Sequence, residues 1–173
     1  MRLENKIAVV TGGGSGFGTG IAERFAQEGA ALVIADINMD AAEDTASRLN
    51  GMPVQADVSR NDDMAALAAA VMDRHGRIDI FVNNAGITHL PTPMDEIEEA
   101  EFDRVLMVNT KSVYLSARHV VPVMKRQESG VILNIASTAG VSPRPNLSWY
   151  NATKGWMITA TKSMAVELAP FGI

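Results

Sequence analysis

The chain has 173 residues, 47% of them hydrophobic, which is enough to bury one substantial core as a single domain over residues 1–173. Fifteen basic against twenty acidic side chains give a net charge of -5, which argues against nucleic acid or an anionic membrane surface as a partner. Without cysteine, a leader segment or an apolar run of the roughly 18 residues that span a bilayer, we expect a cytoplasmic protein held together by packing alone.

Short apolar runs rich in β-branched residues alternate with longer stretches of helical periodicity along the whole chain. The expected strands cover residues 7–10, 32–35, 53–56, 78–82 and 131–135. The expected helices cover residues 16–28, 40–49, 62–75, 103–127 and 148–168. Because right-handed crossovers place the helices on both faces of a parallel sheet, this order predicts an α/β fold with a Rossmann-like doubly wound parallel sheet.

A glycine-rich segment, T-G-G-G-S-G-F-G at residues 11–18, follows the first expected strand and opens the first helix. Glycines let the backbone turn tightly and approach a pyrophosphate, and the free N–H groups of a helix N-terminus attract phosphate. The segment lacks the G-K-[ST] sequence of a P-loop nucleotide hydrolase. Glycine clusters also mark ordinary turns, so this loop indicates a dinucleotide only in combination with other features.

Asp36 ends the second expected strand, twenty residues after Gly16, where a carboxylate can accept hydrogen bonds from an adenosine ribose diol. The same carboxylate would repel a 2′-phosphate, and the neighbouring Ile37 and Ser15 offer no basic group to offset the repulsion. The combination predicts NAD in preference to NADP. The alternative interpretation is that Asp36 only begins a turn or caps a helix.

Two further segments follow the third and fourth strands, at the carboxyl edge of the sheet where ligands of open α/β folds bind. Asp57 and Val58 are candidates for contact with an adenine ring. The sequence N-N-A-G at residues 83–86 provides small residues that permit close approach of a cofactor or of neighbouring backbone. Its asparagines can equally be structural and tie the loop to the strand.

Tyr150 and Lys154 are four residues apart near the start of the last helix, so they share one of its faces. A tyrosine side chain ordinarily titrates near pH 10, and a basic role at neutral pH needs nearby positive charge such as an ammonium group or a nicotinamide ring. Ser137, just beyond the fifth strand, is placed to hydrogen-bond and polarise a carbonyl oxygen. Asn109 falls inside an expected helix, and each of these four residues taken alone is more commonly structural.

Together the glycine loop, the N-N-A-G segment, Asn109, Ser137 and the Tyr150-x(3)-Lys154 pair closely resemble the short-chain dehydrogenase/reductase family, in its order and spacing and over essentially the whole chain. The resemblance extends to members of the 3-oxoacyl-[acyl-carrier-protein] reductase and glucose 1-dehydrogenase type. It implies hydride transfer between nicotinamide C4 and a secondary alcohol or ketone, with Ser137, Tyr150 and Lys154 acting together. In that family the Tyr is the general acid/base, the Lys contacts the nicotinamide ribose, and the Asn anchors a water in a proton relay.

The cofactor contacts expected from the motifs and from the resemblance lie in the loops after the first four strands and in the last helix. They are Gly12, Ser15, Gly16, Phe17, Gly18, Asp36, Ile37, Asp57, Val58, Asn84, Ala85, Gly86, Tyr150 and Lys154. Within this set, the resemblance gives Gly18 mainly a role in helix packing. No metal site is expected, because the three histidines lack close ligand spacing.

Relatives in the family continue into a sixth strand, substrate-covering helices and a seventh strand, so we expect a C-terminally truncated chain whose sheet lacks the last two strands. The resemblance also implies a homodimer or homotetramer built through the helices over residues 103–127 and 148–168. Two other interpretations remain: a non-catalytic or inactive truncated dinucleotide-binding module, and a methyltransferase that uses S-adenosylmethionine. The Tyr150–Lys154 pair argues against both, and the identity of the alcohol or ketone substrate stays open.

Overall fold

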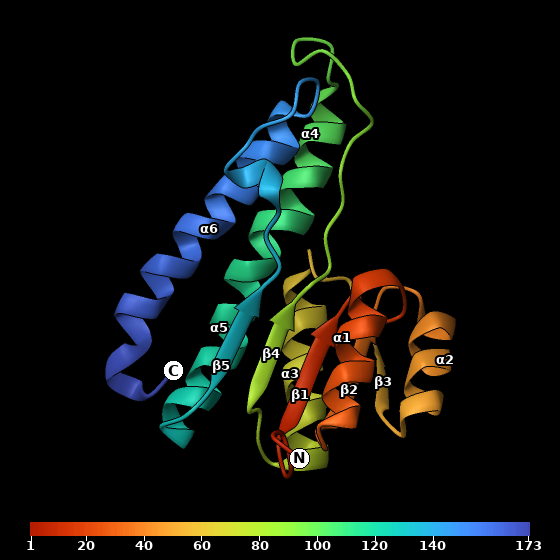
Figure 1. Ribbon diagram of the computed structural model, residues 1–173, viewed down its shortest axis with the longest axis vertical. Helices are drawn as coiled ribbons and strands as arrows, with labels where there is room; N and C mark the ends of the chain where they lie inside the picture. The colour runs from red at the N-terminus through yellow and green to blue at the C-terminus, as the bar shows by residue number, and fades with distance from the viewer.

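The computed structural model describes residues 1–173 and has a five-stranded parallel sheet at its centre, in the order β3-β2-β1-β4-β5 (Figure 1). The strands are β1 (Ile7–Thr11), β2 (Ala31–Asp36), β3 (Met52–Gln55), β4 (Ile80–Asn83) and β5 (Val131–Asn134). The long helices are α1 (Gly16–Gln27), α2 (Met39–Leu49), α3 (Asn61–His75), α4 (Glu99–Leu106), α5 (Ser112–Gln127) and α6 (Ser148–Leu168). A π-helical turn, η1 (Met107–Lys111), and two 3-10 turns, η2 (Thr138–Gly140) and η3 (Ala169–Phe171), complete the elements.

Alternate residues of the strands enter two separate hydrophobic clusters, one on each face of the sheet. On one face Val9, Val33 and Phe81 pack against α3 and α5. On the other face Val10 and Ile34 pack against α1 and α2. Both faces are therefore covered by helices, and the predicted doubly wound α/β architecture is confirmed.

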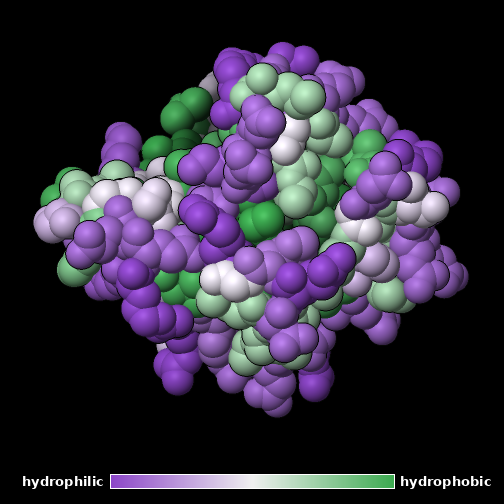
Figure 2. Space-filling model, turned by 90° about the horizontal axis from the view of Figure 1, so that it is seen from below, coloured by the Kyte–Doolittle hydropathy of each residue, from purple (hydrophilic) through white to green (hydrophobic).

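The strand order reverses direction at β1, which pairs with β2 on one side and with β4 on the other. The loops that follow β1 and β4 therefore leave the same edge of the sheet on opposite sides of a crevice, which is where open α/β sheets bind ligands. Figure 1 shows this edge at the top, with α4 and the start of α6 rising beyond it. The opposite end of the molecule mixes hydrophilic and hydrophobic surface (Figure 2).

The prediction of a single helix over residues 103–127 is wrong in two respects. The observed helical segment begins earlier, at Glu99, where acidic side chains in the first turn interact favourably with the helix dipole. It is also interrupted by the π-helical turn η1, so that α4 and α5 are separate helices. The interruption contains the buried Asn109, whose side chain bonds to backbone outside the helix rather than to solvent.

The fourth strand begins at Ile80, two residues later than expected. Asp79, just before it, is held by a different set of contacts: its carboxylate accepts from the N–H of Ile7 at 2.9 Å and from Arg77 at 2.6 Å. This buried carboxylate fixes the amino ends of β1 and β4 beside each other.

No helix of the molecule is both long enough and apolar enough to cross a bilayer.

Candidate active site

The glycine loop between β1 and α1 has two residues in the left-handed region, Gly12 at φ 61° and Gly16 at φ 54°. Gly12 also lies against the loop after β4, because an added Cβ would be 2.9 Å from the Cα of Ala85. At Gly18, in the first turn of α1, an added Cβ would overlap the carbonyl oxygen of Gly12. The loop is thus folded tightly on itself and packed against the β4 loop, with no space for a side chain at Gly12 or Gly18.

Thr11 and Asn84 join the loops after β1 and β4. The hydroxyl of Thr11 donates to the carbonyl of Val82 at 3.0 Å and accepts from the N–H groups of Asn84 and Ala85 at 3.1 and 3.2 Å. The side-chain amide of Asn84 donates to the carbonyls of Thr11 and Gly12 at 2.8 and 3.1 Å. The structural interpretation of the asparagine therefore holds for Asn84, which also faces the cleft described next.

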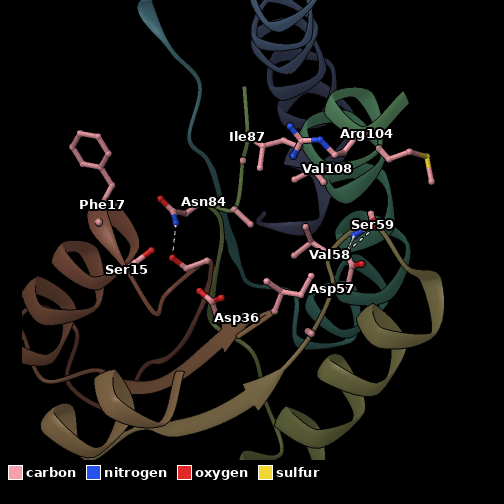
Figure 3. Close-up of a pocket in the computed structure, with 17 residues that line it drawn as sticks. Ser15, Phe17, Asp36, Asp57, Val58, Ser59, Asn84, Ile87, Arg104 and Val108 are labelled. Carbon is pink, nitrogen blue, oxygen red and sulfur yellow. Dashed lines mark hydrogen bonds between the residues drawn. The ribbon is translucent and has the colours of Figure 1, made fainter. Parts of the chain in front are cut away.

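A cleft of about 590 Å³ lies at the carboxyl edge of the sheet, between these loops and the end of α4 with the turn η1 (Figure 3). Of the fourteen residues predicted to contact the cofactor, Gly18, Tyr150 and Lys154 do not line this cleft. The eleven that do are Gly12, Ser15, Gly16, Phe17, Asp36, Ile37, Asp57, Val58, Asn84, Ala85 and Gly86. A tightly folded glycine loop before the N-terminus of α1, with a carboxylate on the wall of the same cleft, fits a dinucleotide.

Asp36 is held by two backbone amides. Its Oδ2 accepts from the N–H of Gly14 and its Oδ1 from the N–H of Asn38, both at 3.0 Å. The bond to Asn38 is the turn expected in the alternative interpretation, so the residue begins a turn and lines the cleft at the same time. Two apolar side chains beside the cleft are exposed, Phe17 by 86% and Ile37 by 64%.

A second cleft, of about 480 Å³, adjoins the first and contains the predicted catalytic residues Ser137, Tyr150 and Lys154. The two clefts share four lining residues, which are Phe17, Asn84, Gly86 and Ile87. The hydroxyl oxygen of Ser137 accepts from the N–H of Ala139 at 3.1 Å, which leaves its own hydrogen free to donate. The topology thus brings Ser137, from the loop between β5 and η2, and two residues of α6 to the end of the cofactor cleft.

Lys154 is 5% exposed, and its ammonium group donates to the carbonyl of Ile135 at 2.9 Å. Burial lowers the pKa of Lys154 below its ordinary value of 10.5, because the charged form loses hydration. The nitrogen lies 6.0 Å from the centre of the Tyr150 ring. An added Cβ on Gly86 would be 3.4 Å from the same nitrogen, so the absence of a side chain there leaves the ammonium accessible from the shared wall of the clefts.

Asn109 lines neither cleft and is completely buried. Its Oδ1 accepts from the N–H of Ile87 at 2.9 Å, and its Nδ2 donates to the carbonyl of Ile87 at 2.8 Å and to Thr153 at 3.1 Å. The Thr153 hydroxyl in turn donates to the carbonyl of Tyr150 at 2.7 Å. The side chain of Asn109 therefore connects the loop after β4 to the helix that carries Tyr150.

The comparison with known proteins agrees with this geometry. The family model described as short chain dehydrogenase matches residues 6–173. The 4-formylbenzenesulfonate dehydrogenase TsaC1/TsaC2 of Comamonas testosteroni is 44% identical over 178 residues, which cover 100% of this chain and 71% of that relative. The chain belongs to the short-chain dehydrogenase/reductase family.

Solved structures of short-chain dehydrogenases/reductases superimpose closely on the chain. The 3-ketoacyl-(acyl-carrier-protein) reductase from Brucella melitensis complexed with NADH matches with a TM-score of 0.97 and 47% identity, covering 99% of this chain and 72% of that chain. An NAD+-bound xylitol dehydrogenase matches with a TM-score of 0.95 and 31% identity, covering 100% of this chain and 68% of that chain. Both solved structures therefore share the fold of this chain over nearly all of its length.

Six residues of the cofactor cleft were not predicted from the sequence: Ala56, Ser59, Ile87, Arg104, Met107 and Val108. Ala56, Ser59 and Ile87 adjoin predicted residues, so extending each post-strand segment by one residue would have included them. Arg104, Met107 and Val108 lie on α4 and η1, where the helical pattern gives no sign that one face borders a ligand. No group of three or more His, Asp or Glu side chains that could hold a metal ion occurs.

Proposed function

We propose that this chain carries the nucleotide site and catalytic residues of an NAD-dependent oxidoreductase that interconverts a secondary alcohol and a ketone. The observation that carries the proposal is the position of Ser137, Tyr150 and Lys154 in a cleft that adjoins the glycine-loop cleft across a shared wall. Bound NAD would supply the hydride acceptor, and NADH the donor, at nicotinamide C4. The family membership supports an oxidoreductase activity of this kind.

The residues of the second cleft have complementary roles in the proposed reaction. The free hydrogen of the Ser137 hydroxyl donates to the substrate oxygen and stabilises negative charge on it. The phenol of Tyr150 removes the alcohol proton in oxidation and returns one to the oxygen in reduction. Lys154 would bind the nicotinamide ribose through its ammonium group. Asn109 acts as a positioning residue that holds Ile87 and the start of α6 in register.

The cofactor proposed for the larger cleft is NAD rather than NADP. Asp36 places a carboxylate on the cleft wall, where a ribose diol can donate to it and a 2′-phosphate would be repelled. The relatives crystallised with NADH and with NAD+ support this choice. The proposed substrate is a small molecule, and the relatives' names, which include a 4-formylbenzenesulfonate dehydrogenase and a levodione reductase, span different carbonyl compounds.

The Tyr150→Phe variant tests the proposal. It removes one hydroxyl and preserves ring volume, so folding and NADH binding should be retained. Turnover, measured as NADH formation or consumption with a panel of secondary alcohols and ketones, should fall by about 10²- to 10⁴-fold because general acid/base help is lost. Tyr114→Phe, at an exposed tyrosine on α5, is the matched control and should keep parental turnover. Parental kcat in Tyr150→Phe would contradict the proposed role of this phenol.

A further inference from the structure

Gly14 lies next to the carboxylate of Asp36 without lining the cofactor cleft. Its N–H donates to Asp36 Oδ2 at 3.0 Å, and the N–H of the preceding Gly13 donates to the carbonyl of Ala35 at 3.1 Å. The glycine loop is therefore joined to the end of β2 at two consecutive residues. One of these two bonds ends on the side chain that the nucleotide would meet.

Space, rather than backbone conformation, requires glycine at position 14. Its φ lies outside the left-handed region, so an L-residue could adopt the same backbone. An added Cβ would lie 2.8 Å from the Cβ of Ala41 and 2.9 Å from Asp36 Oδ2. Any side chain at this position must therefore displace the Asp36 carboxylate, the start of α2, or both.

The contacts of Asp36 orient its carboxylate before a nucleotide binds. The N–H of Gly14 occupies one lone pair of Oδ2, and the N–H of Asn38 occupies one lone pair of Oδ1. Charge-assisted bonds of this kind are strong and directional. Each oxygen keeps a second lone pair for a donor in the cleft that Asp36 lines. A ribose diol supplies two hydroxyl donors. A phosphate on the 2′ oxygen removes one of these donors and adds negative charge.

We propose that Gly14 is a specificity-determining residue, which holds the Asp36 carboxylate in the position that accepts a ribose diol and repels a 2′-phosphate. The inference rests on the proposed use of NAD. Gly14 acts by leaving room for the carboxylate and by donating to it, so it is a positioning residue that touches Asp36. Its effect falls on the adenosine end of the nucleotide and not on the reacting end.

The test compares the dissociation constants of NADH and NADPH for the unaltered chain and for Gly14→Ala, measured by titration calorimetry. In Gly14→Ala we expect the Kd of NADH to rise about tenfold and the Kd of NADPH to change less. The ratio of the NADPH Kd to the NADH Kd should therefore fall about tenfold. Gly20→Ala is the matched control, because Gly20 is exposed on α1 and an added Cβ there meets no atom within 4 Å. This control should keep the parental ratio.

A second variant removes the side-chain part of the overlap with α2. Gly14→Ala combined with Ala41→Gly removes the 2.8 Å approach of two Cβ atoms and keeps the 2.9 Å approach to Asp36 Oδ2, together with a 3.0 Å approach to the carbonyl carbon of residue 41. The double variant should fold and show the same fall in the ratio, whereas Ala41→Gly alone should keep the parental ratio. This design keeps the inference testable if the single variant is unstable.

The outcomes distinguish a failure of the role proposed for Gly14 from a failure of the proposed preference for NAD. A parental ratio in the double variant, or an equal rise of both dissociation constants, would overturn the role of Gly14 and leave the preference for NAD intact. Equal binding of NADH and NADPH by the unaltered chain, with no change in Asp36→Ala, would overturn both proposals. A lower ratio in Asp36→Ala and in both Gly14 variants would support both.

Discussion

Lys154 shows how burial changes a residue that sequence reasoning selected for its charge. The spacing from Tyr150 predicts a shared helix face, and the structure places both residues in one cleft. The sequence does not reveal that the ammonium group is almost completely buried and bonded to the carbonyl of Ile135, because that contact depends on how α6 packs beside β5. The bond from Gly14 to Asp36 was hidden for the same reason, because Gly14 is 22 residues away in the chain.

The lowered pKa of Lys154 predicts a pH dependence of folding stability. The folded chain binds fewer protons at this group than the unfolded chain between the lowered pKa and 10.5. The contribution of Lys154 to the free energy of unfolding therefore rises with pH across that window. Denaturant midpoints of the unaltered chain and of Lys154→Met should be measured from pH 7 to pH 10. As pH increases, the midpoint of the unaltered chain should rise relative to that of Lys154→Met.

Lys162→Met, on the exposed side of the same helix, is the matched control for the loss of a lysine. If the difference in midpoint between the unaltered chain and Lys154→Met stayed constant with pH, burial would not lower the pKa of Lys154.

At the scale of elements, most of the fold could be predicted because each strand is a short apolar run followed by a distinct loop. The π-helical turn η1 could not, since residues 107–111 contain no glycine or proline to mark an interruption. Pro122, by contrast, lies inside α5 without ending it. The interruption depends instead on Asn109 reaching the backbone of Ile87, a contact between segments 22 residues apart.

Asn109→Ala should destabilise the chain by about 2 kcal/mol, because the N–H and carbonyl of Ile87 lose their side-chain partners. Asn109→Asp should cost more, because it places a carboxylate at a completely buried position, with one oxygen facing the carbonyl of Ile87 to which Nδ2 donates at 2.8 Å. Urea unfolding of the three proteins would measure these differences. If Asn109→Ala had the midpoint of the unaltered chain, the side chain would not stabilise the π-helical turn.

At the scale of the whole molecule, apolar side chains remain exposed on the two long helices proposed to form an interface. Tyr114 on α5 is 53% exposed, and Trp156 and Val166 on α6 are 44% and 80% exposed. Pairing of copies about a two-fold axis would cover such surfaces. We therefore propose a homodimer or homotetramer built through α5 and α6.

Light scattering across a concentration series should give the mass of two or four chains. Trp156→Glu should shift the population toward the monomer, because a charge placed in an apolar interface is costly to bury. Val141→Glu, at an exposed apolar residue outside both helices, is the control. A monomer at high concentration would contradict the proposal for this chain.

The hydrogen bond from Thr11 to Val82 joins residues 71 positions apart, so it has a consequence for how the chain folds. The central strand β1 comes first along the chain. Its partner β4, and the amides that bind the Thr11 hydroxyl, come only after α1, β2, α2, β3 and α3. Closing so long a segment slows folding, because its entropy is lost before the contact forms. We therefore expect the nucleotide cleft to form late in folding, and a dinucleotide that binds only the completed cleft should stabilise β1 and β4 together as one cooperative unit.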